Sequence, residues 1–597
     1  IIINVPLRRV LSFLNNSFMA HASKIFESQP VRVQNVNGFD LSHITTGTAI
    51  TGKLTPVLNR LVMQQTKVSI GCAVNVELPP LATAFFGRID ANIELFFTPC
   101  SILYGGFKQF ISAQVASMFP TTQESIFDAG GFALPVFDLN TTAIYNRIRA
   151  LNATNRGLSD YLDVYVGANR PASSGAFISM LAYLNYHRIW DTWYRNASVT
   201  KTIFAVNPLA SGSPAIDPGV SSTFHKNVSL VWHSFFTESQ VLNSVNQREL
   251  SSSAVFDTLA DLTFPDGIDL FEMRQRNYPR DYFTAASVNP QQGNPSSVRS
   301  FVVTDPDTEE SYVELSIPAL RMSNSLQKFY EAANYDPTYK GIMRAHFGHN
   351  PKDAEMDEPM YLGRVSFPVY QKSVYQSVDT GDVSGSNKNP FAAGGALGAK
   401  AAHGEFSGEG SLVSNFTCGS FGFLTALFSL VPHAMYSQGI SRQMTMTKLG
   451  DFPFPELQST GMDSIKTREL MFDYDAGVTG ADWDLDFAYI PRYSFMKYID
   501  DSCHGELRPN KTLSSFVLQR VFPSNSVPAF GTAFCEIPEN ALDDVLSTSV
   551  DLSNFTCWYE IYWVFKAVMP LAEFCLPTLG ELQDTHEIRV SQGGSRL

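Results

Sequence analysis

The densest group of side chains that could bind a metal ion lies at residues 346–358. His346 and His349 are followed by four acidic residues: Asp353, Glu355, Asp357 and Glu358. Carboxylates of this kind suit hard cations when they converge on one point. A glycine, an asparagine and a proline interrupt any helix that would align the two histidines. We therefore favour a solvated turn over a metal site, and we expect neither a metal ion nor a cofactor.

Two further motifs could carry chemistry. Residues 394–398 (GGALG) are similar to a phosphate-binding loop, but no Lys-Ser/Thr pair follows them and no buried strand precedes them. Cys503 lies beside His504, yet neighbouring residues on a strand point to opposite faces, so the sequence predicts no thiol–imidazole pair. The sequence contains no Gly-x-Ser-x-Gly elbow and no HExxH motif. Together these observations disfavour an enzyme.

Aromatic residues gather within residues 183–194, beside Arg188 and Arg195. They are Tyr183, Tyr186, Trp190, Trp193 and Tyr194. Such rings can stack on the bases of a single-stranded nucleic acid. Aromatic residues are also common anchors of cores and interfaces, and we favour a buried helix that faces an interface.

The elements that must position these residues are mainly strands. Residues 89–97 and 68–76 alternate between apolar and polar or small side chains, and the first of these runs predicts a strand with one buried face. Shorter strands are expected at five further places: 228–236, 311–317, 484–490, 516–522 and 555–568. Long segments rich in Ser, Asn, Gly and Pro separate them. This pattern favours an all-β core with large insertions over alternating strands and helices.

Helices are expected as additions to that core. Pro318 suits a first helical turn, and the apolar residues after it form one face of a helix: Met322, Leu326, Phe329, Tyr330 and Ala333. A second helix is predicted over residues 183–194. Residues 381–410 hold eight glycines and six alanines and are predicted to form a flexible or closely packed loop.

The composition narrows the class of protein. Of the 597 residues, 44% are hydrophobic, which is enough for a substantial core and excludes wholesale disorder. Only 17% are charged and 12% are aromatic, as extensive protein–protein contact requires. No apolar run approaches the roughly 20 residues of a membrane span. The first apolar stretch carries Arg8 and Arg9 and lacks the layout of a signal peptide. Seven cysteines without a CxxC pair favour a reducing compartment.

The charge is uneven along the chain. The net charge is −14, yet the first hundred residues hold eight Lys or Arg and five acids. A basic end suits a polyanion, although an ordinary N-terminal segment explains so small an excess equally well.

A series of short motifs runs along the chain: residues 39–43 (FDLSH), Arg88 with 95–99 (LFFTP), 190–196 (WDTWYRN), 281–284 (DYFT), 290–293 (PQQG), 320–323 (LRMS), 327–328 (QK), 346–348 (HFG), 361–363 (YLG), 436–439 (YSQG) with Arg442, and 492–493 (RY). Taken in this order, they resemble the major capsid proteins of small single-stranded DNA phages, the Microviridae, especially gokushovirus-like ones. The resemblance assigns structural roles to Asp40, Arg195, Asp281, Tyr282, Phe283, Arg321, His346, Gly348, Arg442 and Arg492. In gokushoviruses a long variable insertion commonly follows the motif that PQQG resembles, whereas this chain has only a short segment there. The difference favours a divergent lineage of the family.

The resemblance implies a single eight-stranded antiparallel jelly roll of the viral capsid type, with large loop and short-helix insertions. It also implies self-assembly of identical subunits into an icosahedral shell around a circular single-stranded DNA genome, and a surface for host attachment. The expected partners are the genome, an internal scaffolding protein, a small basic DNA-packaging protein and a host receptor, without membrane insertion. The protein is then expected in the virion, assembled in the host cytoplasm.

We expect residues 1–60 to form an interior-facing arm in which Arg8 and Arg9 contact DNA. Residues 61–597 would form the jelly-roll domain, with insertions near 115–180, 197–276 and 381–410. The alternative is a jelly-roll carbohydrate-binding adhesin or glycan-degrading enzyme, suggested by Trp190 and Trp193 together with abundant acids.

Overall fold

The computed structural model describes the chain in segments. They are residues 36–80, 86–103, 107, 111, 134–170, 176–200, 202–203, 255–256, 263–264, 268–291, 301–304, 311–314, 317–336, 338–375, 400–458, 461–473, 483–546 and 554–571. The chain divides into two compact units, Asp40–Ala567 and a smaller one of Ile1–Phe39 with Val568–Leu597. In the smaller unit the Asn37 side-chain amide donates to the Leu571 carbonyl at 2.8 Å. Strand β1 (Asn37–Asp40) crosses the boundary between the units.

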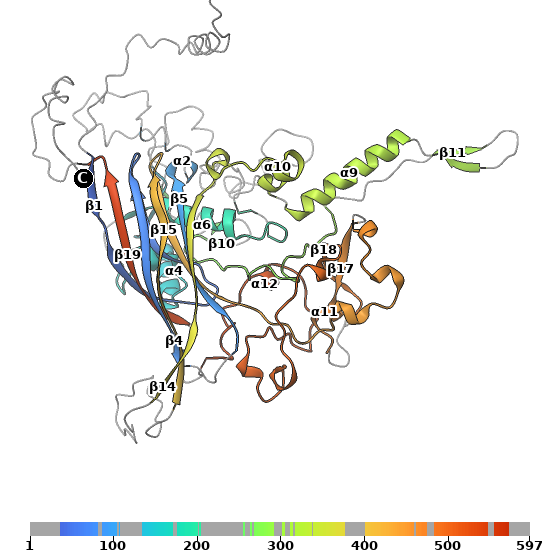
Figure 1. Cartoon of the computed structure of the whole chain (residues 1–597). Helices are drawn as coiled ribbons and strands as arrows, with labels where there is room; N and C mark the ends of the chain where they lie inside the picture. The colour runs from blue at the N-terminus through green and yellow to red at the C-terminus, as the bar shows by residue number, and fades with distance from the viewer. Residues whose placement is uncertain are drawn as a thin grey trace, which may run out of the picture. The chain divides into compact units, whose positions relative to one another are not determined.

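In the first of two large sheets β19, β4, β15 and β14 are neighbours in that order (Figure 1), and β2 pairs with β19. Its strands are β2 (His43–Ala49), β19 (Cys557–Met569), β4 (Lys67–Pro80), β15 (Lys400–Thr417) and β14 (Tyr370–Tyr375). The side chains of β19 alternate between buried and exposed, as a strand with one core-facing side requires. Strand β4 alternates between buried and half-buried side chains. The strands predicted at 68–76 and 555–568 are therefore confirmed.

The second sheet has the order β13-β5-β16-β3. Its strands are β13 (Met360–Pro368), β5 (Ile89–Pro99), β16 (Gly422–Pro432) and β3 (Thr55–Val62), and every neighbouring pair runs antiparallel. The prediction that β5 buries one face is wrong, because both faces are buried. The Phe97 side packs on the first sheet, with its ring centroid 5.4 Å from that of Phe416. The Phe96 side is covered by Tyr194, at 6.0 Å between ring centroids.

The two sheets pack face to face. Phe428 of β16 contacts Tyr559 of β19, with the ring centroids 5.1 Å apart. At Gly410 of β15 a Cβ atom would lie 2.8 Å from Val365 of β13, so only glycine allows this approach. The prediction of a loop over residues 381–410 is therefore wrong from residue 400 onward, where the chain forms β15. The small residues of this strand allow it to pack closely on the opposite sheet. Residues 381–399 lie outside the described residues.

A long excursion separates β5 from β13. Its elements are α2 (Cys100–Leu103), β6 (Val136–Asp138), α4 (Thr142–Ala153), α5 (Leu158–Tyr161), β7 (Phe177–Ser179), α6 (Leu181–Ile189), the π-helix η1 (Trp190–Tyr194), β8 (Val255–Phe256), β9 (Thr263–Phe264), β10 (Ile268–Asp269), β11 (Phe301–Thr304), β12 (Ser311–Glu314), α9 (Ile317–Tyr335), α10 (Tyr339–Phe347) and the 3-10 helix η5 (Asp353–Met356). Both predicted helices are confirmed, the first as α9 and the second as α6 with η1. The run at 311–317 is only partly a strand, since α9 begins at Ile317.

The aromatic residues of α6 and η1 belong to a hydrophobic core beside the second sheet. Tyr183, Tyr186, Trp190 and Tyr194 are buried there, whereas Trp193 is 38% exposed. The Asn185 side chain donates to Thr425 of β16 at 2.7 Å, which fixes α6 on the sheet. The preference for a buried aromatic helix over a base-stacking platform is confirmed for these four rings.

A second excursion lies between β16 and β19. Its elements are the 3-10 helices η6 (Arg442–Thr445), η7 (Leu449–Asp451) and η8 (Pro455–Leu457), then β17 (Met462–Lys466), α11 (Thr467–Leu470), β18 (Asp486–Pro491), η9 (Ser494–Met496), η10 (Gly505–Leu507), η11 (Ser514–Phe516) and α12 (Thr532–Cys535). The strand expected at 484–490 is β18. The strand expected at 516–522 is wrong, because Val517 and Gln519 form only isolated bridges there. The strand expected at 228–236 lies outside the described residues.

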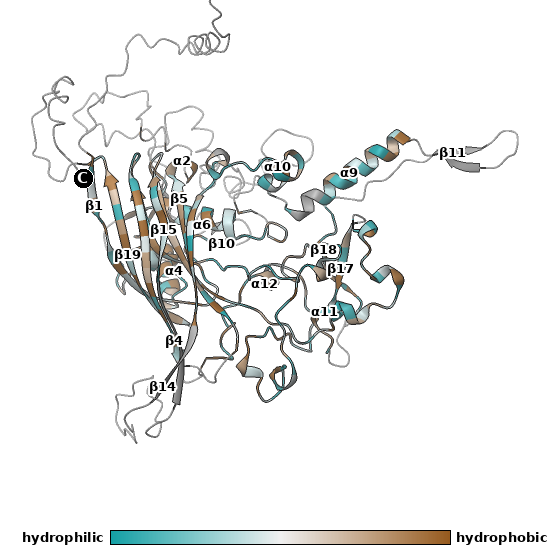
Figure 2. Ribbon diagram, viewed as in Figure 1, coloured by the Kyte–Doolittle hydropathy of each residue, from teal (hydrophilic) through white to brown (hydrophobic). Residues whose placement is uncertain are grey.

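The described part of the chain is thus mostly antiparallel β-sheet with packed insertions. None of its helices has the length and apolar character needed to cross a membrane. Figure 2 shows that hydrophobic and hydrophilic positions also mix along α9.

Candidate functional site

Residues from separate sequence motifs, on both excursions, meet around one buried carboxylate. Asp281, Tyr282, Phe283, Arg442 and Arg492 lie here around the buried carboxylate of Glu469, and we call this group the motif cluster. Tyr282 and Phe283 share a hydrophobic core with Tyr436, Ile465 and Leu470. The sequence spacing of these motifs gave no indication that they converge.

Glu469 is the centre of the motif cluster. Its Oε2 accepts a hydrogen bond from the Tyr282 hydroxyl at 2.9 Å, and its Oε1 accepts from Arg442 Nη1 at 3.2 Å. The Lys466 backbone N–H also donates to Oε1, at 3.0 Å, so the carboxylate caps the start of α11. Burial raises the pKa of Glu469 above its usual value, although these partners favour its charged form.

Arg442 and Arg492 connect this carboxylate to the β17–β18 hairpin. Arg442 Nη1 donates to the Ser464 carbonyl at 2.7 Å, and its Nη2 lies 3.6 Å from Asp463. Arg492 Nε lies 3.8 Å from the other oxygen of Asp463. The two motif arginines therefore hold one acidic residue between them.

Asp281 organises the turn that carries Tyr282. Its Oδ1 accepts from the backbone N–H groups of Phe283 at 3.0 Å and Thr284 at 2.7 Å. Its Oδ2 accepts from the Tyr436 hydroxyl at 2.8 Å. The DYFT motif is thus a turn whose aspartate replaces missing backbone partners and ties it to the YSQG motif.

An open pocket of about 430 Å³ borders the motif cluster and is lined by Tyr282, Arg442, Glu469, Asp500 and His504, among others. Asp500 Oδ1 accepts from the Tyr282 backbone N–H at 3.0 Å. Burial, and then the nearby charges of Asp281 and Asp501, raise the pKa of Asp500 to about 6.

The remaining motif residues have local structural contacts. Arg195 binds Asp191 at 2.9 Å, and Asp40 accepts from Ser42. Gly348 ends α10 in the left-handed conformation, with φ of 66°, and His346 stacks on Phe329. Arg321 lies exposed on α9. Arg8 and Arg9 lie outside the described residues.

The acidic run near His346 binds a lysine. Lys340 lies 2.8 Å from Glu358 and also binds Asp353, which anchors η5 to α10. No set of three or more metal-binding side chains is grouped in the described residues. Cys503 is buried near Gln519, whereas His504 is exposed and contacts Ser502, so the two side chains have different partners.

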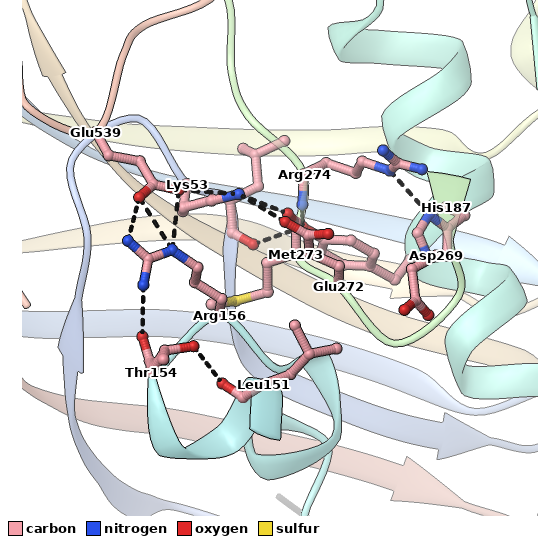
Figure 3. A network of polar contacts seen from close by, with 12 residues as sticks. Lys53, Leu151, Thr154, Arg156, His187, Asp269, Glu272, Met273, Arg274 and Glu539 are labelled. Carbon is pink, nitrogen blue, oxygen red and sulfur yellow. Dashed lines mark hydrogen bonds and ion pairs between the residues drawn. The ribbon is translucent and has the colours of Figure 1, made fainter. Parts of the chain in front are cut away.

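A buried ion-pair network that the sequence analysis missed joins distant segments (Figure 3). Lys53 is only 4% exposed and lies 3.3 Å from Glu539, 3.6 Å from Glu272 and 3.1 Å from the Met273 carbonyl. Arg156 Nε and Nη2 both donate to Glu539 Oε2. We call Lys53, Arg156, Glu272 and Glu539 the lysine clamp. It connects the loop before β3, the end of α4 and the segment before β19.

The outer face of β5 carries a second missed network. Glu94 Oε2 accepts from Arg276 Nη1 at 2.7 Å and from the Tyr194 hydroxyl. On the same face Asn92 accepts from Arg364, and Asp90 binds Arg88. The polar positions of the predicted strand could have indicated this network from the sequence. Alternating acids under an aromatic helix need buried partners.

Arginine, lysine or tyrosine side chains bind the acidic side chains at the centres of these networks. The networks therefore fix the long insertions onto the two sheets. Residues 302–573 match the family model described as capsid protein (F protein). No curated protein matched the chain. An antiparallel β-fold with internally braced insertions and this match together define a viral capsid protein, a structural protein. This match confirms the resemblance to the major capsid proteins of the Microviridae found in the sequence.

Proposed function

We propose that this chain is the major coat subunit of an icosahedral shell around a circular single-stranded DNA genome. The observation that carries the proposal is the strand order. Taken along the chain, β2, β3, β4, β5, β13, β15, β16 and β19 are the first to eighth strands. One sheet then reads first, eighth, third, sixth, and the other second, seventh, fourth, fifth.

This order supports an eight-stranded jelly roll with β14 added beside the sixth strand. The first strand neighbours the eighth, the second the seventh, the third the sixth and the fourth the fifth. One long hairpin rolled over on itself produces these pairs, and the resulting double sheet is typical of viral capsid proteins. Closed symmetry then multiplies each subunit contact, so individually modest interfaces can stabilise a whole shell.

The partners follow from this role. Identical subunits form the shell, an internal scaffolding protein guides assembly in the host cytoplasm, and a small basic packaging protein neutralises much of the DNA. The outer surface attaches to a host receptor, and the insertions near 115–180 and 197–276 are candidates for that surface. Within the proposed N-terminal arm of residues 1–60, the stretch from His43 onward includes β2 and the first part of β3.

Expression of the full chain, alone and together with its scaffolding protein, tests the shell. We expect closed particles of uniform diameter in negative-stain electron microscopy. A chain that stays monomeric under both conditions contradicts the proposal. Release of reducing sugar from glycans by the free chain would instead support the glycan-degrading alternative.

The basic start of the chain gives a separate prediction for the genome. Arg8 and Arg9 would bind phosphates without sequence preference, and such binding weakens as salt rises. We expect Arg8→Ala/Arg9→Ala particles to lose DNA at a lower salt concentration than wild-type particles. The measurement is the DNA retained per particle across a salt series, and equal retention contradicts the DNA contact.

A further inference from the structure

Helix α9 exposes a stripe of apolar side chains. Met322, Leu326 and Phe329 follow one another at intervals of four and three residues, and they are 67%, 40% and 48% exposed. Ala319 and Ala333 continue this spacing in the sequence. Alternating intervals of three and four are the pattern of a coiled-coil seam. We call Met322, Leu326 and Phe329 the α9 stripe.

The side of α9 that the rest of the chain covers is small and polar. Ala319, Ser323 and Gln327 are half-buried at intervals of four, and Gln327 Nε2 donates to Gln291 Oε1 at 2.5 Å. An amphipathic helix normally turns its apolar side toward its own core. Here the apolar side is left largely exposed, and Phe329 gains support from the stacked ring of His346, at 4.8 Å between centroids.

We propose that the α9 stripe packs against the α9 stripe of another copy of this chain. This inference rests on the proposed shell, in which many identical copies surround symmetry axes. At a two-fold axis the same surface patch of two subunits meets itself, so identical helices can contact at identical residues. Each stripe then buries apolar area, at about 25 cal/mol per Å², at a contact that the shell repeats many times.

Charge along the helix favours an identical partner. With Leu326 at a heptad a position and Met322 and Phe329 at d, the flanking e and g positions hold Ser323, Ser325 and Tyr330. These residues carry no charge, so two copies meet without the like-charge opposition that flanking residues often impose. The charged residues of α9 fall at other heptad positions: Arg321, Lys328 and Glu331.

Disulfide trapping tests the contact directly. Assembled particles of Leu326→Cys, oxidised under mild conditions, should yield a covalent dimer on a non-reducing gel that dithiothreitol reverses. Asn324→Cys is the matched control, because Asn324 is exposed on the same helix at the f position, away from the seam. The six cysteines in the described residues are all buried, and wild-type particles give the background. No dimer from Leu326→Cys particles, or equal dimer from Asn324→Cys, overturns the proposal.

Assembly gives an independent readout. Met322→Lys/Leu326→Lys should reduce the yield of closed shells at least tenfold, whereas Asn324→Lys should leave the yield unchanged. The circular dichroism of the free subunits should be the same in wild type and in both variants. Shells at the wild-type yield from the double variant overturn the α9 contact but leave the proposed function intact. Failure of the wild-type chain to form shells overturns the proposed function itself, so the two failures are distinguishable.

Discussion

Replacing Arg442 with alanine should lower the free energy of unfolding by about 3 to 4 kcal/mol at neutral pH, because it breaks a buried ion pair and leaves one charge behind. Glu469 is 8% exposed and would keep only the Tyr282 hydroxyl and the Lys466 backbone N–H as partners. The measurement is the urea midpoint of unfolding and its slope. A loss below about 1 kcal/mol contradicts the role given to this arginine.

The pH dependence of that loss has a definite sign. Burial already raises the pKa of Glu469, and removing Arg442 raises it further. A carboxyl whose folded-state pKa exceeds its unfolded value of about 4.3 favours folding at lower pH, and this contribution is lost as the pH rises through the folded-state pKa. The deficit of Arg442→Ala should therefore be small near pH 4 and reach its full size near pH 7.

Two further variants make the interpretation specific. Arg442→Ala/Glu469→Gln should recover part of the lost stability, because a neutral amide needs no counter-charge and its oxygen still accepts hydrogen bonds. Arg492→Ala, the other motif arginine on Asp463, should cost less than about 1 kcal/mol, because its contact to Asp463 is long and partly exposed. A double variant no more stable than Arg442→Ala would show that packing, rather than charge, explains the effect.

Glu539→Ala should lower the free energy of unfolding by about 3 kcal/mol at neutral pH, because it removes the acid that Lys53 and Arg156 share in the lysine clamp. Lys53 would remain buried with Glu272 at 3.6 Å as its acidic partner, and Arg156 would lose its hydrogen bonds to Glu539. Burial alone would raise the pKa of Glu539, but the hydrogen bond from Arg156 and the charge of Lys53 hold it below its usual value.

A lowered carboxyl pKa gives the opposite pH dependence. The stabilisation is fully present above the unfolded value of about 4.3 and is lost as the pH falls through the lower folded-state pKa. The difference between wild type and Glu539→Ala, measured by urea unfolding, should thus shrink in acid. Lys53→Met/Glu539→Ala serves as the matched control and should be more stable than Glu539→Ala, since the buried charge that Glu539 had balanced is gone. Equal stability of these two variants contradicts the argument.

Much of the sheet scaffold could be predicted from the sequence because strands show local alternation or are rich in β-branched and aromatic residues. Strand β4 alternates, the runs that became β18 and β19 are rich in such residues, and α9 was visible from its apolar spacing. The run at 516–522 is also rich in strand-forming residues, but its backbone forms only isolated bridges, and local composition carries no information on whether a partner strand is present. Strand β15 was hidden because its glycines, of which Gly410 lies close to Val365, have low strand propensity.

The site was predictable only as separate motifs. Tyr282, Arg442 and Glu469 are brought together by folding, and the motif match identified the first two without indicating their shared partner. Lys53 and Glu539 have no motif at all, and nearly the whole chain lies between them. Single charged residues at such separation give no sequence signal, because any of many acids could be the partner.

The strand order also determines when each sheet can form during synthesis of the chain. The partner of β2 in the first sheet is β19, which ends at Met569, and the partners of β5 in the second sheet begin at Met360 and Gly422. At about 5 to 20 residues per second, roughly half a minute or more of synthesis separates β2 from β19. Neither sheet can close before its last strand has been made, which is β16, ending at Pro432, for the second sheet and β19 for the first. The early strands therefore leave the ribosome with unpaired edges and depend on chaperones, or on their own insertions, to keep them apart.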